Sequence, residues 1–230
     1  MKKSDFIAVL ILGEIAAWLI LAVVKGVLNP DLYDRVHGLI TLALPIIFPI
    51  ACLIFIYLAS IISKKVIVAY EVAKFILVGG LNTLVDWGIL SFLIFTFKRS
   101  GINSDKTLFE VFSIAIILYT LLKAISFIIA TANSYLWNKF WTFKRKTTEK
   151  MGKEFMQFIV VSIIGFLVNV GIASFIFKSV PSLGGLNSDQ WGLVAAAIAT
   201  VISMIWNFIG YKFIVFDKKD GEQPSNIPQV

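Results

Sequence analysis

Charged residues are scarce in this sequence, and cysteine and histidine are nearly absent. Only 15% of the 230 residues are charged, whereas 58% are hydrophobic and the mean hydropathy is +0.87. Soluble domains are about a quarter charged, so this chain has too little polar surface for a soluble globule and is predicted to be an integral membrane protein. The one cysteine, Cys52, excludes an intramolecular disulfide and is interpreted as a packing residue. The one histidine, His37, has no second histidine to complete a metal site.

The sequence also lacks the motifs of several functional classes. A net charge of +7 is compatible with nucleic-acid binding, but no zinc spacing, helix-turn-helix signal or RNA-binding motif accompanies it. No nucleophile–base set, acidic pair in a loop or glycine-rich phosphate loop is present. We therefore expect no enzymatic activity, no cofactor and no nucleic-acid partner.

Six apolar segments are long enough to cross a bilayer, which takes about 20 residues. They are residues 6–25, 38–62, 73–97, 111–137, 155–177 and 192–214. The first follows a basic start without a cleavage site, so we expect it to be retained as a span. In the second, Pro45 and Pro49 remove two helix donors one turn apart, which favours a kinked helix over a re-entrant hairpin. The predicted fold class is an all-α polytopic membrane protein with six transmembrane helices.

Lysine and arginine are distributed unevenly between the two sides of these spans. Fourteen fall on the side of both termini and six on the other side. Because basic residues resist translocation, both termini are predicted to be cytoplasmic and the protein to be a multi-pass plasma-membrane protein. The polar tail, residues 218–230, is predicted to be disordered.

The later part of the chain contains an internal repeat. The segment "KFILVGGLNTLVDWGILSFLIF" aligns with "QFIVVSIIGFLVNVGIASFIF", and "SYLWNKFWTFK" aligns with "NFIGYKFIVFD". The aligned pairs include Phe75 with Phe158, Gly88 with Gly171, Ser91 with Ser174, Phe92 with Phe175, Lys139 with Lys212 and Phe143 with Phe216. Two hairpins of the same orientation form a parallel repeat, so a four-helix core made of two repeated hairpins is predicted.

These motifs, the "VGGLNTLVDW" of one span and the "SYLWNKFWTF" that ends the next, resemble the GtrA-like membrane proteins over residues 71–217. The resemblance implies a small bacterial or archaeal protein that helps move polyprenyl-phosphate-linked sugars across the membrane for glycosylation of envelope polysaccharides. Similar domains anchor some glycosyltransferases, so the implied partners are the sugar lipid, membrane lipids and a membrane glycosyltransferase. Residues 1–65 would form a two-span extension. Four core helices enclose little volume, which favours a homodimer.

Two charged residues fall in the middle of neighbouring spans. Asp86 lies midway between Lys74 and Lys98, and Lys123 falls in the middle of the next span. A charge alone at the bilayer midplane costs about 2.5–3.5 kcal/mol, so we predict that Asp86 and Lys123 contact each other. The pair either fixes the packing of the hairpin or lines a polar path for an anionic headgroup.

Four further residues complete the set of substrate-binding candidates. Asn82 lies one turn before Asp86, and Asn169 is the counterpart of Asp86 in the repeat; both amides either bond between helices or line a sugar path. Lys139 and Lys212 are interleaved with aromatic residues at cytoplasmic ends, where they either anchor the helices or grip a lipid phosphate.

Glu14 is a further carboxylate within the first span, outside the repeat. Its carboxylate is expected to be shielded from lipid either by Trp18, one turn later, or by polar groups of other spans. A proton-coupled drug exporter would need such a carboxylate, but Lys123 beside Asp86 weakens that alternative. Five glycines are expected to let helices approach closely: Gly79, Gly80, Gly88, Gly165 and Gly171.

Overall fold

The computed structural model of the chain describes residues 1–27, 30–111, 114–145, 148 and 150–217. The chain divides into two compact units, Met1–Lys144 and Arg145–Val230. The tail predicted to be disordered, residues 218–230, lies outside the described residues.

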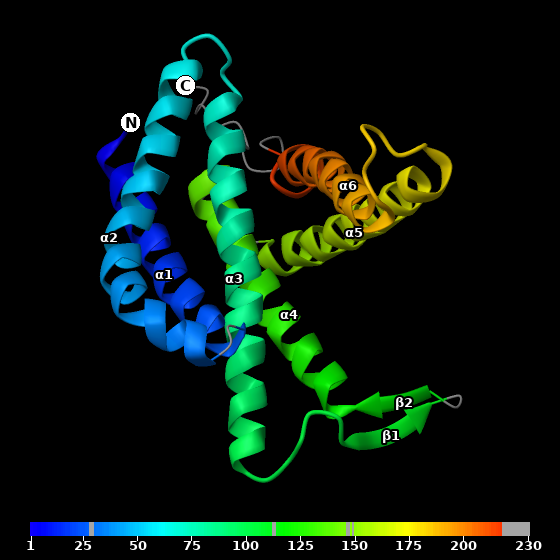
Figure 1. Cartoon of the computed structure of the whole chain (residues 1–230). Coiled ribbons are helices and arrows are strands. Elements are labelled where there is room, and N and C mark those ends of the chain that lie inside the picture. The colour runs from blue at the N-terminus through cyan, green and yellow to red at the C-terminus, as the bar shows by residue number, and fades with distance from the viewer. Residues whose placement is uncertain (28–29, 112–113, 146–147, 149, 218–230) are drawn as a thin grey trace, which may run out of the picture. The chain divides into compact units, whose positions relative to one another are not determined.

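The first unit contains four helices, a two-stranded hairpin and a π-helical turn (Figure 1). They are α1 (Lys3–Val27), α2 (Pro30–Ile62), α3 (Ala69–Arg99), β1 (Thr107–Val111), β2 (Ile114–Ile117), α4 (Leu118–Trp137) and η1 (Asn138–Thr142). The second unit consists of α5 (Met151–Ser179), α6 (Ser188–Gly210) and the π-helical turn η2 (Tyr211–Val215).

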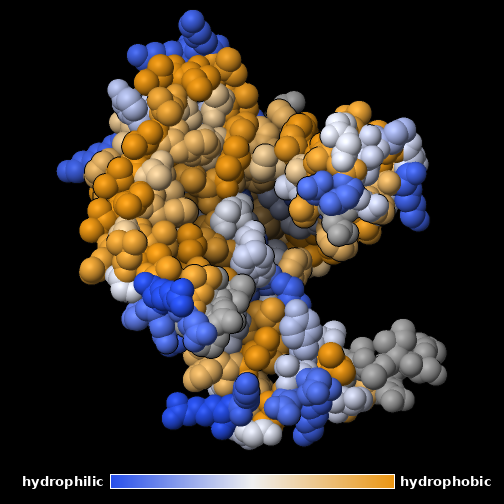
Figure 2. Space-filling view, viewed as in Figure 1, coloured by the Kyte–Doolittle hydropathy of each residue, from blue (hydrophilic) through white to orange (hydrophobic). Residues whose placement is uncertain are grey.

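Five helices in the described part of the chain are long and apolar enough to cross a membrane. They are α1, α2, α3, α5 and α6 with η2. Large apolar side chains on them face outward; Leu39 and Leu42 of α2, for example, are 74% and 75% exposed. In Figure 2 the surface over α1 and α2 is hydrophobic, with hydrophilic residues at both ends of that unit. This distribution suits a lipid environment and confirms a polytopic helical membrane protein.

The span predicted over residues 111–137 is wrong in its first part. Val111 pairs with Ile114 in the antiparallel hairpin, and the helix begins only at Leu118. The β-branched residues of this short apolar run favour a strand, and hydropathy alone cannot distinguish a strand from a helix there. The remaining helix, α4, carries Lys123 and Asn133 and is not among the five candidate spans. Within the described residues, length and composition therefore identify five spans, one fewer than expected.

The helix α2 is continuous through both prolines, so the re-entrant alternative for this segment is wrong. Figure 1 shows one curved, uninterrupted helix beside α1. The two helices approach closely where a Cβ atom on Gly13 would lie 2.7 Å from the Cα atom of Pro49. The backbone of α1 thus packs directly on the proline-containing part of α2.

The core of the first unit is shared by α1, α2 and α3. Buried members are Val9, Leu12 and Ala16 of α1, Cys52, Ile56 and Ala59 of α2, Ala73, Val78 and Leu81 of α3, and Trp141 of η1. Cys52 is a buried free thiol, which confirms its interpretation as a packing residue. The two helices predicted as an extension therefore pack with α3 in one core.

The second unit is a tight hairpin of α5 and α6. A Cβ atom on Gly165 would lie 2.1 Å from Oδ1 of Asn207, so the glycine permits this approach, as predicted. Gly88 of the first unit has the same role beside Leu19. At the other three glycines, Gly79, Gly80 and Gly171, a Cβ atom would meet nothing within 4 Å outside its own stretch of helix, so no close approach is seen there.

Replacing Gly13 by Ala is expected to lower the free energy of unfolding by about 1–3 kcal/mol, a usual cost of overpacking. The added methyl group would meet the backbone of Pro49, which cannot rotate away. Thermal unfolding of the detergent-solubilised protein measures the change. The matched control is Gly38→Ala on α2, where nothing lies within 4 Å, and where alanine should stabilise the helix by about 0.5–1 kcal/mol. Equal effects of the two substitutions would contradict the close packing of α1 on α2.

Candidate functional site

The predicted contact between Asp86 and Lys123 is confirmed. Lys123 Nζ of α4 forms an ion pair with Oδ2 of Asp86 on α3. The carboxylate is only 16% exposed, whereas the lysine is 39% exposed. The carboxylate is thus the more buried partner, and the ammonium is the more accessible one. We call Asp86, Lys123 and the adjoining Ser126 the midspan cluster.

Ser126 belongs to this cluster but is not among the residues predicted from the sequence. Its hydroxyl donates to Oδ1 of Asp86 at 2.7 Å and also lies 3.0 Å from the carbonyl oxygen of Lys123. The side chain is fully buried. The available signal is the spacing from Lys123, because residues three apart on a helix share a face.

Asn82 lies one turn before Asp86 on α3, and its Oδ1 is buried without a hydrogen-bond partner among the described residues. On α4, Nδ2 of Asn133 is likewise buried without a hydrogen-bond partner among the described residues. A buried polar group without a partner costs about 1–3 kcal/mol. One acceptor and one donor thus remain in the same hairpin as the midspan cluster, and sugar hydroxyls can bond both kinds of atom.

Asn169, the repeat counterpart of Asp86, lies in a neutral network instead. Its Nδ2 donates to Ser203 Oγ at 3.2 Å and to Thr200 Oγ1 at 3.4 Å. All three residues belong to the α5–α6 hairpin. The same position therefore joins the helices by an ion pair in one hairpin and by amide–hydroxyl bonds in the other.

Lys139 and Lys212 occupy matching π-helical turns, one at the end of each repeat. Lys139 is the second residue of η1, and Lys212 is the second residue of η2. Each ammonium lies over two aromatic rings, at 5.7 and 5.9 Å in both turns. The sequence repeat is thus matched in backbone geometry. Such turns occur often at functional sites.

The two lysines differ in burial. Lys139 is fully buried and donates to the hydroxyl of Tyr135 at 3.3 Å, whereas Lys212 is partly exposed. A fully buried ammonium is more than a membrane-surface anchor, which would reach into the headgroup layer. The anchor interpretation therefore fits Lys212 better than Lys139.

A second ion pair, this one fully buried, lies where α1 and α3 begin, and sequence reasoning missed it. Asp5 Oδ1 lies 2.5 Å from Lys74 Nζ, and both side chains are 2% exposed or less. Trp141 Nε1 donates to the same oxygen at 3.1 Å, and Tyr70 donates to Oδ2 at 3.1 Å. In the sequence both charges resemble ordinary residues at helix ends, so only their packing reveals the pair.

Glu14 and Trp18 are paired, as one alternative expected. Trp18 Nε1 donates to a Glu14 carboxylate oxygen at 2.9 Å. Glu14 also lines an apolar groove of about 550 Å³ between α1 and α2, together with Pro45 and Pro49. His37 stacks on Tyr33 with ring centroids 5.3 Å apart.

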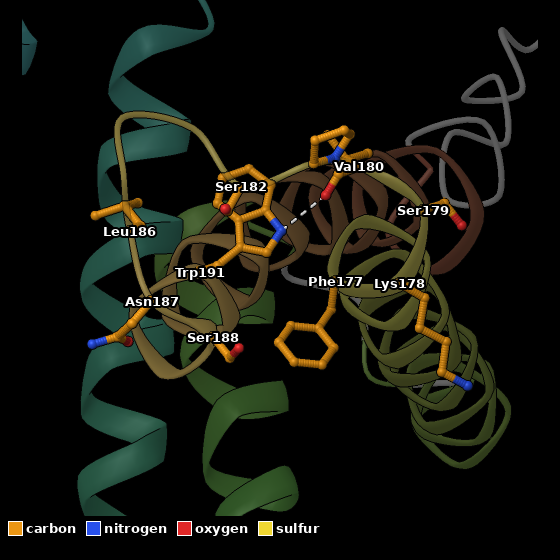
Figure 3. Close-up of a pocket in the computed structure, with 10 residues that line it drawn as sticks. Phe177, Lys178, Ser179, Val180, Ser182, Leu186, Asn187, Ser188 and Trp191 are labelled. Carbon is orange, nitrogen blue, oxygen red and sulfur yellow. Dashed lines mark hydrogen bonds between the residues drawn. The ribbon is translucent and has the colours of Figure 1, made fainter.

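A polar pocket of about 540 Å³ lies at the α5–α6 connection, at the end of the hairpin opposite Lys212 (Figure 3). Trp191 Nε1 donates to the carbonyl oxygen of Val180 at 3.1 Å across it. Asn187 begins α6 as its N-cap and exchanges side-chain bonds with Gln190. These hydrogen bonds hold the α5–α6 connection against the ends of the two helices. We therefore interpret the pocket as a consequence of the loop conformation.

The part of the chain that matches a known protein family is nearly the same as the part that contains the internal repeat. The model of one family, described as "GtrA/DPMS, transmembrane domain", matches residues 74–216. The chain belongs to this family. The match agrees with the resemblance over residues 71–217 and includes every predicted substrate-binding residue.

A relative in Bacillus subtilis supports the assignment. It is described as "Uncharacterized membrane protein YngA" and is 28% identical to this GtrA/DPMS chain over 145 residues, which is 62% of the chain and 77% of the relative. No solved structure matches the chain.

Proposed function

We propose that this GtrA/DPMS protein helps move polyprenyl-phosphate-linked sugars across the plasma membrane, where they are used to glycosylate cell-envelope polysaccharides. The observation that carries the proposal is the midspan cluster. Ionised groups inside a membrane are costly and are usually functional, and this cluster lies within the residues that match the family.

The chemistry of the cluster suits a sugar that crosses the membrane. Asp86 accepts hydrogen bonds, Lys123 can donate, and Asn82 has a buried acceptor without a described partner. Because hydroxyl groups both donate and accept, a sugar could replace part of its water shell with these contacts. Lys123, the more exposed partner, would follow the anionic phosphate while Ser126 continues to bond the carboxylate.

The lysines of the π-helical turns, Lys139 and Lys212, would bind the phosphate at the side where the lipid is made, because they recur at the same position of each repeat. Lys212 is partly exposed, so its ammonium can attract an anionic headgroup at the membrane surface. Lys139 is fully buried and would first have to leave its contact with Tyr135. The protein would perform no covalent chemistry, because binding and release are sufficient for translocation.

Six spans and cytoplasmic termini are part of the proposal. α4 with η1 returns along α3, because Lys123 contacts Asp86 in the middle of α3 and Trp141 contacts Asp5 at the end where α1 begins. A helix of 20 residues is about 30 Å long, the thickness of the hydrocarbon core. The polar residues that lower the hydropathy of α4 would then face the bundle rather than lipid.

The alternative function is a membrane anchor or assembly subunit for a polyprenyl-phosphate glycosyltransferase. The family description favours keeping it, because it names a transmembrane domain rather than a transporter. The docking segment would be the basic stretch 144–154, of which residues 146, 147 and 149 lie outside the described residues.

The sidedness of the sugar lipid in cells separates the two functions. In cells that lack this protein, a translocation role predicts that sugar lipid is still made but stays inaccessible to an impermeant labelling reagent. Re-expression should restore access. If synthesis of the sugar lipid falls instead, and the residual lipid is normally accessible, the anchor function replaces the proposal.

A further inference from the structure

A small cavity of about 350 Å³ lies at the end of the first unit where α1 begins, α2 ends and α3 begins. Lys2, Asp5, Ser60, Ser63, Tyr70 and Lys144 line it. Of these, only Lys144 falls within residues 74–216, so the cavity is built mainly by the part of the chain that the family model does not match.

The carboxylate that lines this cavity, Asp5, is already neutralised by Lys74. Asp5 accepts from Lys74 and Trp141 through one oxygen and from Tyr70 through the other. Since both carboxylate oxygens already accept hydrogen bonds, Asp5 is held in place and in turn positions Tyr70. It is a poor site for a cation, because Lys74 already supplies the positive charge.

The side-chain charges that remain available at the cavity, those of Lys2 and Lys144, are positive. Both side chains are exposed, and neither forms an ion pair with a carboxylate among the described residues. Lys144 interacts electrostatically with the Asp5–Lys74 pair without belonging to it. The N-terminal ends of α1 and α3 also lie at this cavity and add positive potential. At the end of α2, the hydroxyls of Ser60 and Ser63 bond helix carbonyls, which keeps the oxygens of that helix end occupied.

The backbone of Lys144 is an independent sign that its side chain matters here. Its φ angle is +56°, the only positive φ among the described residues that are not glycine. Glycine would adopt this conformation without strain. Strained positions of this kind gather at ligand clamps, and Lys144 closely follows η1, where the chain turns toward the cavity.

We propose that this cavity binds a phosphate group, held by Lys2 and Lys144. Two cations that face a small polar cavity suit a phosphate, which accepts several charge-assisted hydrogen bonds. The phosphate could belong to a lipid headgroup or to a free anion, and both share this chemistry. The inference goes beyond the proposed function, because this cavity is lined by neither Lys139 nor Lys212 and is built mainly by residues that the family model does not match.

The test measures binding by the full-length protein in maltoside micelles, which contain no phosphate. Isothermal titration compares an isoprenyl monophosphate, the same isoprenol without phosphate, and inorganic phosphate. The lipid monophosphate should bind more tightly than the alcohol. Competition by inorganic phosphate would mean that the free anion suffices, whereas its failure to compete would assign the site to lipid-linked phosphate.

Variants separate the side chain of Lys144 from its backbone. Lys144→Gly should weaken binding of the monophosphate by about tenfold, as expected when one charge-assisted bond is lost, while thermal stability without ligand stays equal or rises. Lys144→Gln gives a second folded reference of similar length. The control Lys65→Gln removes a charge in the α2–α3 connection that does not line the cavity, and it should bind as the wild type.

Two results would overturn the site: equal binding of isoprenol and its monophosphate, or wild-type binding by both Lys144 variants. The double variant Asp86→Asn with Lys123→Gln leaves this cavity intact and should still bind. Loss of transport in that variant with retained binding keeps the two proposals distinguishable.

Discussion

Lys74→Met is expected to lower the free energy of unfolding by about 3–5 kcal/mol, the cost of removing one partner of a buried ion pair. Asp5 would keep its bonds to Tyr70 and Trp141 but lose its only described ion-pair partner. Lys74 also lies 4.7 Å from the ring centroid of Tyr70 and 5.0 Å from that of Trp141, so its removal loosens packing as well. Thermal or denaturant unfolding in detergent measures the effect.

Two comparisons make this result specific to the pair. Lys65→Met removes an exposed lysine from the same end of the unit and should change stability by less than about 0.5 kcal/mol. Asp5→Leu combined with Lys74→Met removes both charges and should recover part of the loss, although Tyr70 and Trp141 then lack their acceptor. If Lys74→Met is as stable as Lys65→Met, the buried pair does not hold α1 against α3.

Replacing Asp86 by Asn and Lys123 by Gln together is expected to reduce sugar-lipid transport at least tenfold while the protein stays folded. Two amides can still bond each other and Ser126, so the α3–α4 contact keeps its hydrogen bonds. A hydrogen bond to a charged group contributes about 1.5–3 kcal/mol, and about 1.4 kcal/mol corresponds to a factor of ten. Loss of the charges should therefore affect the passage of an anionic lipid more than the fold.

The measurement is the transport rate in proteoliposomes, with thermal unfolding as the check on folding. Lys98→Gln is the matched control, because it removes a charge from the far end of the same helix and away from Asp86. If the folded double variant transports at the wild-type rate, the midspan cluster only fixes the packing of α3 against α4.

The sequence predicts contacts well where the energetic penalty is large and local. A charge inside an apolar span must find a partner, and this requirement alone is enough to pair Asp86 with Lys123. The repeat is visible as well, because Lys139 and Lys212 recur at a fixed position, although nothing in the sequence indicates that both lie in π-helical turns.

Prediction fails where the environment of a residue depends on tertiary packing. Asp5 and Lys74 are the kind of charge that normally flanks a span, and only the meeting of α1, α3 and η1 buries them. The hairpin before α4 is predicted as part of a span, because β-branched apolar residues satisfy hydropathy in either conformation.

The repeat also clarifies how the two hairpins differ. They share helix order, the glycine and lysine positions and the π-helical turns, yet one joins its helices through Asp86 and the other through Asn169. An ion pair can exchange partners with an incoming anion, whereas amide–hydroxyl bonds chiefly fix packing. We therefore propose that the first hairpin binds the anionic headgroup of the sugar lipid.

The most direct test of the proposed function is the transbilayer movement of a labelled polyprenyl-phosphate sugar in sealed vesicles that contain this protein alone. We predict movement faster than in protein-free vesicles, and a rate near the protein-free level for the folded Asp86→Asn, Lys123→Gln variant. A wild-type rate no faster than that of protein-free vesicles would contradict the account.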